Sequence, residues 1–171
     1  LNMDSTFFTN STGWPHPDLK TTANDLVKLT KGMILNFPEL YKLFFEKEFT
    51  YNQIRQYNRN PFLVGRHLVN GADGLKTGHT NESGYGLIGS VKRNNRRITI
   101  VVNGLSGKKQ RAIESKRLVE IAFRETYLLR MFKEQNTLVE ANVWLGRANK
   151  IELVAEKPLK ILIARPMIRK T

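Results

Sequence analysis

The sequence predicts an α+β fold in which an antiparallel sheet is flanked by helices. Three successive segments, at residues 72–80, 84–92 and 98–103, alternate in the manner of strands and are joined by connections short enough for hairpins. Stretches with apolar residues at helical spacing, at residues 22–36 and 106–129, lie on either side of these strands in the chain. Consecutive hairpins followed by a helix that covers them are typical of α+β domains.

A change in pattern after residue 129 predicts a second domain. Beyond that point the chain consists of short alternating segments separated by Gly146, Asn149 and Pro158, which is typical of a small β-rich unit. We place one domain at residues 1–129 and part of a β-rich domain at residues 130–171. The expected strands of the second domain are 138–139, 143–145, 151–154 and 159–164.

The composition allows a buried core and predicts an anionic partner. The 171 residues are 40% hydrophobic, carry a formal net charge of +13 and contain no Cys, which excludes disulfides, thiolate metal sites and cysteine nucleophiles. The charge alone does not choose between nucleic acid, acidic lipid and an anionic cell-wall polymer. We expect the basic residues to form a solvated cationic face at turns and on a helix surface. They are Lys92, Arg93, Arg96, Arg97, Lys108, Lys109, Arg111, Lys116 and Arg117.

Before the sheet, the chain is expected to form a loop and then a helix. Residues 6–17 are rich in polar residues, Gly and Pro, which predicts a long loop. Thr22 stands three residues before Asp25, an acidic capping pattern that predicts a helix start, and Pro38 ends this helix near Asn36. One face of the helix is expected to be buried in the core, and its residues are Leu26, Leu29, Met33 and Phe37.

The remaining connections follow from Pro, Asn and Ser positions. Pro38 predicts a short second helix, and residues 47–51 alternate like a strand that turns back at Asn52. Arg59 lies in the polar connection Asn58-Arg59-Asn60-Pro61, which the pattern alone predicts to be a solvated loop. After the sheet, Ser106 is expected to cap a helix that runs to about Leu129.

The segment 72–80 is the strongest candidate for a functional site. Gly74 and Gly78 bracket Lys76 and Thr77, and Gly inside a strand often marks a place where a ligand or another backbone comes close. Lys76 and His79 would project from this strand. Taken alone, they could equally be an exposed strand lysine and a solvated histidine.

The run Asp73-Gly74-Leu75-Lys76-Thr77-Gly78-His79-Thr80 resembles the Lys-Thr-Gly element of serine penicillin-recognising enzymes. Within that group it is most similar to the D-alanyl-D-alanine carboxypeptidases, which are low-molecular-mass penicillin-binding proteins. A bare Lys-Thr-Gly is a weak signal, but the surrounding segments also resemble this family over nearly the whole chain. These segments are 6–25, the Asn-Arg-Asn loop at 58–60, 83–85, 114–116 and 143–146.

The family's chemistry needs two elements before Lys-Thr-Gly that this sequence does not show. One is a nucleophilic Ser in S-x-x-K and the other is S-x-N across the cleft. No S-x-N occurs here, and Ser106-Gly107-Lys108-Lys109, which has the S-x-x-K spelling, follows Lys-Thr-Gly and is interpreted as accidental. We therefore expect the C-terminal part of such an enzyme, without the nucleophile. Its N-terminal half would be provided separately, or the exposed surface would drive self-association.

The resemblance implies a serine carboxypeptidase that removes the terminal D-Ala from peptidoglycan stem peptides through an acyl-enzyme, and that binds β-lactams. Lys76, Thr77 and Gly78 would be its catalytic element, with Lys76 assisting proton transfer. Thr77 and Arg59 would bind the terminal carboxylate, and the backbone N–H of His79 would be part of the oxyanion hole. No metal or cofactor is implied. The implied location is the bacterial periplasm or the outer face of the cytoplasmic membrane.

A second hypothesis is a non-catalytic basic module that binds nucleic acid or an anionic surface. In that case the Lys-Thr-Gly strand would be purely structural. Because the basic region lacks interleaved aromatic residues on which bases could stack, a nucleic-acid partner is not expected.

Overall fold

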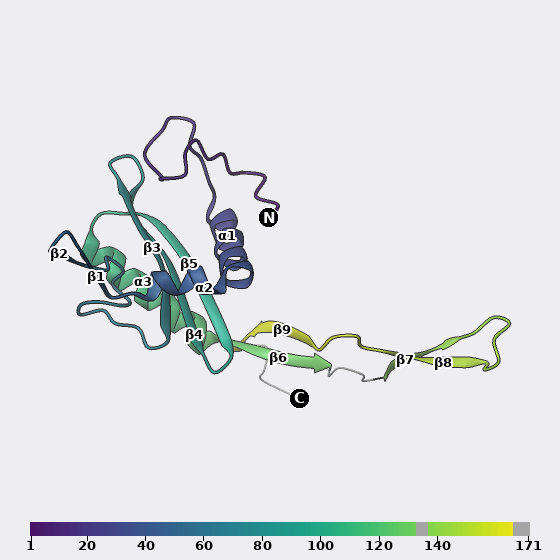
Figure 1. Cartoon of the computed structure of the whole chain (residues 1–171). Helices are drawn as coiled ribbons and strands as arrows, with labels where there is room; N and C mark the ends of the chain where they lie inside the picture. The colour runs from purple at the N-terminus through teal and green to yellow at the C-terminus, as the bar shows by residue number, and fades with distance from the viewer. Residues whose placement is uncertain (133–136, 166–171) are drawn as a thin grey trace. The chain divides into compact units, whose positions relative to one another are not determined.

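The computed structural model describes residues 1–132 and 137–165 (Figure 1). The chain divides into two compact units, Leu1–Ala122 and Phe123–Thr171, so the division falls earlier than the domain boundary predicted at residue 129. The first unit combines helices with an antiparallel sheet, and the second contains antiparallel strand pairs. The α+β fold class is therefore confirmed.

The main sheet has three antiparallel strands in the order β3-β4-β5. These are β3 (Ala72–Thr80), β4 (Gly84–Arg93) and β5 (Arg96–Leu105). Asn94 and Asn95 both have positive φ and form the turn between β4 and β5, as their residue type predicts. Since β4 occupies the centre, β3 is an edge strand of this sheet.

The helix α1 (Ala23–Asn36) begins as the sequence predicts. The Thr22 hydroxyl accepts a hydrogen bond from the backbone N–H of Asp25 at 3.1 Å. The Asp25 carboxylate in turn accepts from the Thr6 hydroxyl at 2.8 Å and from the Ser5 N–H at 3.2 Å, which ties the N-terminal segment to the helix. The apolar face expected to be core is only half-buried, and Phe37 is 56% exposed.

The buried Asp25 carboxylate makes stability depend on pH. The hydrogen bond from Thr6, aided by Lys28 3.2 Å away, holds the pKa of Asp25 below its ordinary value. A carboxyl with a depressed folded pKa stabilises the fold above its unfolded pKa, and this contribution is lost as pH falls through the folded value. We expect the Tm of the wild type to fall once the pH is below about 4. The Tm of Asp25→Asn should be lower than that of the wild type at pH 7 and should fall less on acidification. Thermal unfolding measured from about pH 7 to pH 2 checks this, and parallel curves would contradict it.

Two short helices and a hairpin connect α1 to the sheet. They are α2 (Pro38–Tyr41), the 3-10 helix η1 (Lys42–Phe45), β1 (Glu48–Tyr51) and β2 (Ile54–Tyr57). Asn52 and Gln53 form the turn of the hairpin with positive φ, which confirms the predicted strand and its reversal at Asn52.

The helix α3 (Lys108–Glu125) is shorter than the predicted helix at both ends. At its start, the Gln110 side-chain oxygen accepts from both the N–H and the hydroxyl of Ser106 at 2.8 Å, so Ser106 acts as a donor here. At its end, residues 126–129 belong to the strand β6 (Thr126–Phe132) because they pair with β9 (Leu159–Ala164). Pairing with a distant strand overrides the local helical pattern.

The core of the first unit is formed by side chains from the loop after Asn60, from β4 and from α3. In Figure 1, α3 passes behind the sheet. Arg93 at the end of β4 makes a two-pronged ion pair with Glu120 of α3, at 2.9 and 2.7 Å. The most buried apolar side chains are Phe62, Leu87, Val91 and Val119, each at most 1% exposed.

In the second unit, β6 pairs with β9, and β7 (Thr137–Asn142) pairs with β8 (Lys150–Val154). The strand predicted at residues 143–145 is wrong, because this segment lies in the turn of the β7–β8 hairpin, where Leu145 has φ +56°. Of the helices within residues 1–132 and 137–165, none has the length and apolar character needed to cross a membrane.

Candidate active site

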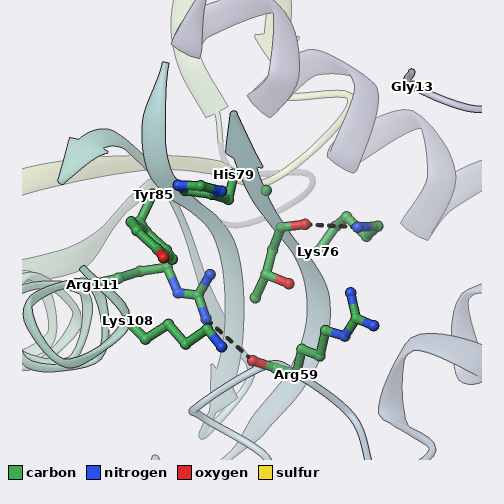
Figure 2. Close-up of a pocket in the computed structure, with 9 residues that line it drawn as sticks. Gly13, Arg59, Lys76, His79, Tyr85, Lys108 and Arg111 are labelled. Atoms are coloured by element: carbon green, nitrogen blue, oxygen red, sulfur yellow. Dashed lines mark hydrogen bonds between the residues drawn. The ribbon is translucent and has the colours of Figure 1, made fainter. Parts of the chain in front are cut away.

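The predicted site residues line one hollow of about 810 Å³, shown in Figure 2. Its wall is formed by the exposed face of β3, the second residue of β4, the connection before β3, the first turn of α3 and the loop that contains Gly13. The lining residues are Gly13, Arg59, Lys76, Thr77, Gly78, His79, Tyr85, Lys108 and Arg111.

Alternation along β3 turns Leu75 into the core and Lys76 to the outside. Leu75 is 6% exposed, whereas Lys76 is exposed and its ammonium donates to the Thr77 carbonyl at 2.6 Å. A Cβ added to Gly78 would meet no atom within 4 Å. The space in front of Gly78 is therefore open, and it leaves room for a ligand beside the strand.

A polar cluster behind β3 holds the start of the strand in place. Asp73 accepts from the Tyr41 hydroxyl at 3.1 Å and pairs with the Arg97 guanidinium through both carboxylate oxygens at 2.7 Å. Burial raises the pKa of Tyr41 to about 12, so the phenol stays neutral and remains a donor. A Cβ on Gly74 would lie 2.8 Å from the Tyr41 hydroxyl oxygen, which explains the Gly that precedes Leu75.

Arg59 reaches the hollow because its neighbours fix the loop. Asn58 accepts from the N–H of Asn60 at 2.9 Å, and the buried Asn60 accepts from the N–H of Phe62 at 3.0 Å. The Arg59 side chain itself is exposed. Arg59 is therefore solvated, as its local pattern predicts, and also lines the hollow, as the family resemblance implies.

Arg111 is a site residue that the sequence did not reveal. Its side chain was expected on a solvated face, yet Arg111 is only 7% exposed and its guanidinium lies 5.8 Å from the centre of the Tyr85 ring. The Tyr85 ring also contacts His79, whose ring centre is 3.9 Å from that of Tyr85. Burial lowers the pKa of Arg111, and its Nε has no hydrogen-bond partner.

The expectation of a uniformly solvated cationic face is therefore wrong for four arginines. Arg93 and Arg97 form ion pairs with Glu120 and Asp73. Arg96 is half-buried and donates to the Ala122 carbonyl at 2.8 Å, and Arg111 is buried. One signal in the sequence could have identified Arg111. It shares a helical face with three small or apolar residues that are also buried, Ala112, Ser115 and Val119.

Gly13 also lines the hollow, although it lies far from the sheet in sequence. Asn10 fixes this loop by accepting from the N–H of Gly13 at 2.7 Å and from that of Trp14 at 3.1 Å. Ser106, the serine of the S-x-x-K match, does not line this hollow. Its hydroxyl donates to the Gln110 side chain. Within the described ranges, no three His, Cys, Asp or Glu residues gather as a metal site would require.

Comparison with known proteins places this chain in a family. A sequence profile of D-alanyl-D-alanine carboxypeptidase matches residues 1–107. The D-alanyl-D-alanine carboxypeptidase DacA of Haemophilus influenzae is 34% identical over 91% of this chain and 39% of its own length. The chain thus spans about two-fifths of this relative.

Solved structures agree with the sequence comparison. Penicillin binding protein 5 from Haemophilus influenzae matches 96% of this chain and 47% of its own, with TM-score 0.85 and 33% identity. Penicillin-Binding Protein D2 from Listeria monocytogenes, in its ampicillin-bound form, matches 69% of this chain and 48% of its own, with TM-score 0.62 and 27% identity. By profile, relative and fold, the chain belongs to the D-alanyl-D-alanine carboxypeptidase family.

Proposed function

We propose that residues 1–171 form one wall of the active site of a serine D-Ala-D-Ala carboxypeptidase, which trims the terminal D-Ala from peptidoglycan stem peptides. The observation that carries the proposal is the convergence of Arg59, Lys76, Thr77, Gly78 and His79 on one hollow. The serine comes from a segment outside these residues. It attacks the carbonyl of the last peptide bond and D-Ala leaves; water then hydrolyses the acyl ester, which releases the shortened peptide and regenerates the serine.

Each residue has a role that fits its position. Lys76 is exposed at the hollow, where its charge assists proton transfer to and from the serine. The Thr77 hydroxyl and the Arg59 guanidinium bind the terminal carboxylate, and Arg111 adds a buried positive charge on the same side. The N–H of His79 contributes to the oxyanion hole. Because β3 is an edge strand, the stem peptide can add to it as a further strand.

The same wall accommodates β-lactams, whose carboxylate and carbonyl correspond to those of the peptide. The ampicillin-bound Listeria relative supports this part of the proposal. The reaction on stem peptides takes place where peptidoglycan is exposed, in the periplasm or at the outer face of the cytoplasmic membrane.

Labelled penicillin tests the proposal directly. We expect the longer enzyme, in which residues 1–171 are joined to the serine-bearing segment, to form a covalent adduct and to release D-Ala from a D-Ala-D-Ala peptide. The polypeptide of residues 1–171 alone is expected to form none. Intact mass and gel fluorescence measure the adduct. An adduct on residues 1–171 alone, or none on the longer enzyme, would overturn the proposal.

A further inference from the structure

A second hollow, of about 400 Å³, lies at the end of β3 next to the first one. It is lined by the last residues of β3, the turn into β4, the start of β4, the end of β5 and the residue that follows β5. His79 and Tyr85 line both hollows, and their ring centres are 3.9 Å apart. This stacked pair is therefore the border that the two hollows share.

The two hollows differ in charge. Among the described residues, the lining of the first includes four cations, which are Lys or Arg, and no carboxylate. The lining of the second includes one carboxylate, that of Glu82, and no Lys or Arg within the same ranges. Glu82 is exposed, and in the part of the chain that the structure describes it makes no ion pair. This distribution of charge complements a ligand that has a carboxylate at one end and a cation further along.

Hydrogen bonds hold the turn that carries Glu82. The Ser83 N–H donates to the Thr80 hydroxyl oxygen at 3.0 Å, and the hydroxyl oxygens of Thr80 and Ser83 are 2.7 Å apart. The Gly104 N–H donates to the Ser83 carbonyl at 3.0 Å, which ties the turn to β5. A Cβ added to Gly104 would meet no atom of the described chain within 4 Å, so the space beside it is open. The turn therefore presents Glu82 at a fixed place, with room for a ligand.

The roles assigned under the proposed function give the direction in which a peptide lies on β3. Its terminal carboxylate is bound at Thr77 and Arg59, and the carbonyl that the serine attacks is at the His79 N–H. The peptide therefore runs antiparallel to β3, and its earlier residues continue past His79 toward Thr80 and the turn. Because a strand advances by about 3.4 Å per residue, the residue before D-Ala-D-Ala lies at the second hollow.

We propose that Glu82 selects stem peptides in which the residue before D-Ala-D-Ala carries a cationic side chain, such as the free amino group of a diamino acid. The Glu82 carboxylate forms an ion pair with this ammonium, while the cations of the first hollow bind the terminal carboxylate. The inference deepens the proposed function and rests on it. The cleaved bond and the leaving D-Ala stay the same. Since an ion pair between exposed groups contributes little, Glu82 sets a preference and not a requirement.

Two peptides isolate the charge of that side chain. One is Nα-acetyl-L-Lys-D-Ala-D-Ala, with a free ε-ammonium, and the other is the same peptide acetylated at Nε, which removes the charge. For the longer enzyme, kcat/KM for release of D-Ala is measured at low and high salt. We expect the free ammonium to be preferred by about twofold to fivefold at low salt, and less at high salt. The net charge of +13 on the 171 residues repels a cationic peptide, so the overall charge does not produce this preference.

Glu82→Gln is expected to abolish the preference, and Glu82→Lys to reverse it. Glu46→Gln is the matched control. Glu46 is exposed and lines neither hollow, so this variant loses an equal charge and should keep the preference. Equal kcat/KM for the two peptides in the wild type, or the same loss of preference in both Gln variants, overturns the inference and leaves the proposed function standing. If the longer enzyme cleaves neither peptide, the proposed function fails and the inference fails with it.

Discussion

Replacing Lys76 with Met in the longer enzyme is expected to lower kcat/KM for release of D-Ala by about 10²–10⁴-fold. Lys76 lines the hollow from an exposed position on β3, and its ammonium is held near the strand by the Thr77 carbonyl. Met keeps the length of the side chain and removes only the charge and the proton. The loss should be visible both in D-Ala release and in the rate of acylation by labelled penicillin.

A second substitution distinguishes proton transfer from simple charge. Arg keeps the positive charge, but it does not give up its proton in proteins. If Lys76 moves a proton, Lys76→Arg should restore little of the lost rate. If Lys76 only supplies charge, Arg should restore a large part.

The matched control is Lys92→Met. Lys92 is an exposed cation on β4 that does not line the hollow, and its backbone N–H donates to the Gly71 carbonyl at 2.7 Å. We expect this variant to stay within about twofold of the wild type, as is usual for surface positions. A loss of less than about tenfold in Lys76→Met would contradict the assigned role.

The parts of the fold that the sequence predicts are those with local causes. The turn at Asn94 and Asn95, the hairpin turn at Asn52 and the cap at Thr22 all depend on a few neighbouring residues, and all three occur as predicted. The strand β3 follows from its pattern, because Leu75 is the one large apolar side chain between Gly74 and Lys76 and points to the core.

The parts that the sequence does not predict depend on distant partners. Residues 126–129 have a helical pattern, but they pair with Leu159–Ala164, which lies far along the chain. Arg111 looks like one of several surface charges until α3 is placed against Tyr85 and the Arg59 loop. The family resemblance predicted roles for Lys76 and Arg59 from their motifs, whereas the position of Lys108 at the same hollow became visible only in the structure.

Phe62→Ala is expected to lower the free energy of unfolding of the longer enzyme by about 3–5 kcal/mol. Phe62 is 1% exposed, and its ring packs directly on Gly89 of β4. Its backbone is bonded to Asn60 and Val69, so the cavity would also loosen the loop that carries Arg59. Activity should fall together with stability. Urea denaturation and D-Ala release measure the two effects.

Phe49→Ala is the matched control, because it makes the same substitution at an exposed position. Phe49 lies on β1 and is 67% exposed, so removing the same ring should change stability by no more than about 0.5 kcal/mol. Similar losses in the two variants would contradict the assignment of Phe62 to the core.

The contact between Phe62 and Gly89 can be tested from both sides. A Cβ on Gly89 would lie 2.6 Å from Cε2 of Phe62, so Gly89→Ala alone is expected to cost about 1–3 kcal/mol through overpacking. In the Phe62→Ala background that ring is gone, and the added methyl group enters the vacated space. Gly89→Ala should then cost much less. A coupling energy of about 0.5–3 kcal/mol in the double-mutant cycle would show that Gly89 is glycine because the Phe62 ring occupies the place of its side chain. Additive effects would mean that the cost of Gly89→Ala does not come from the Phe62 ring.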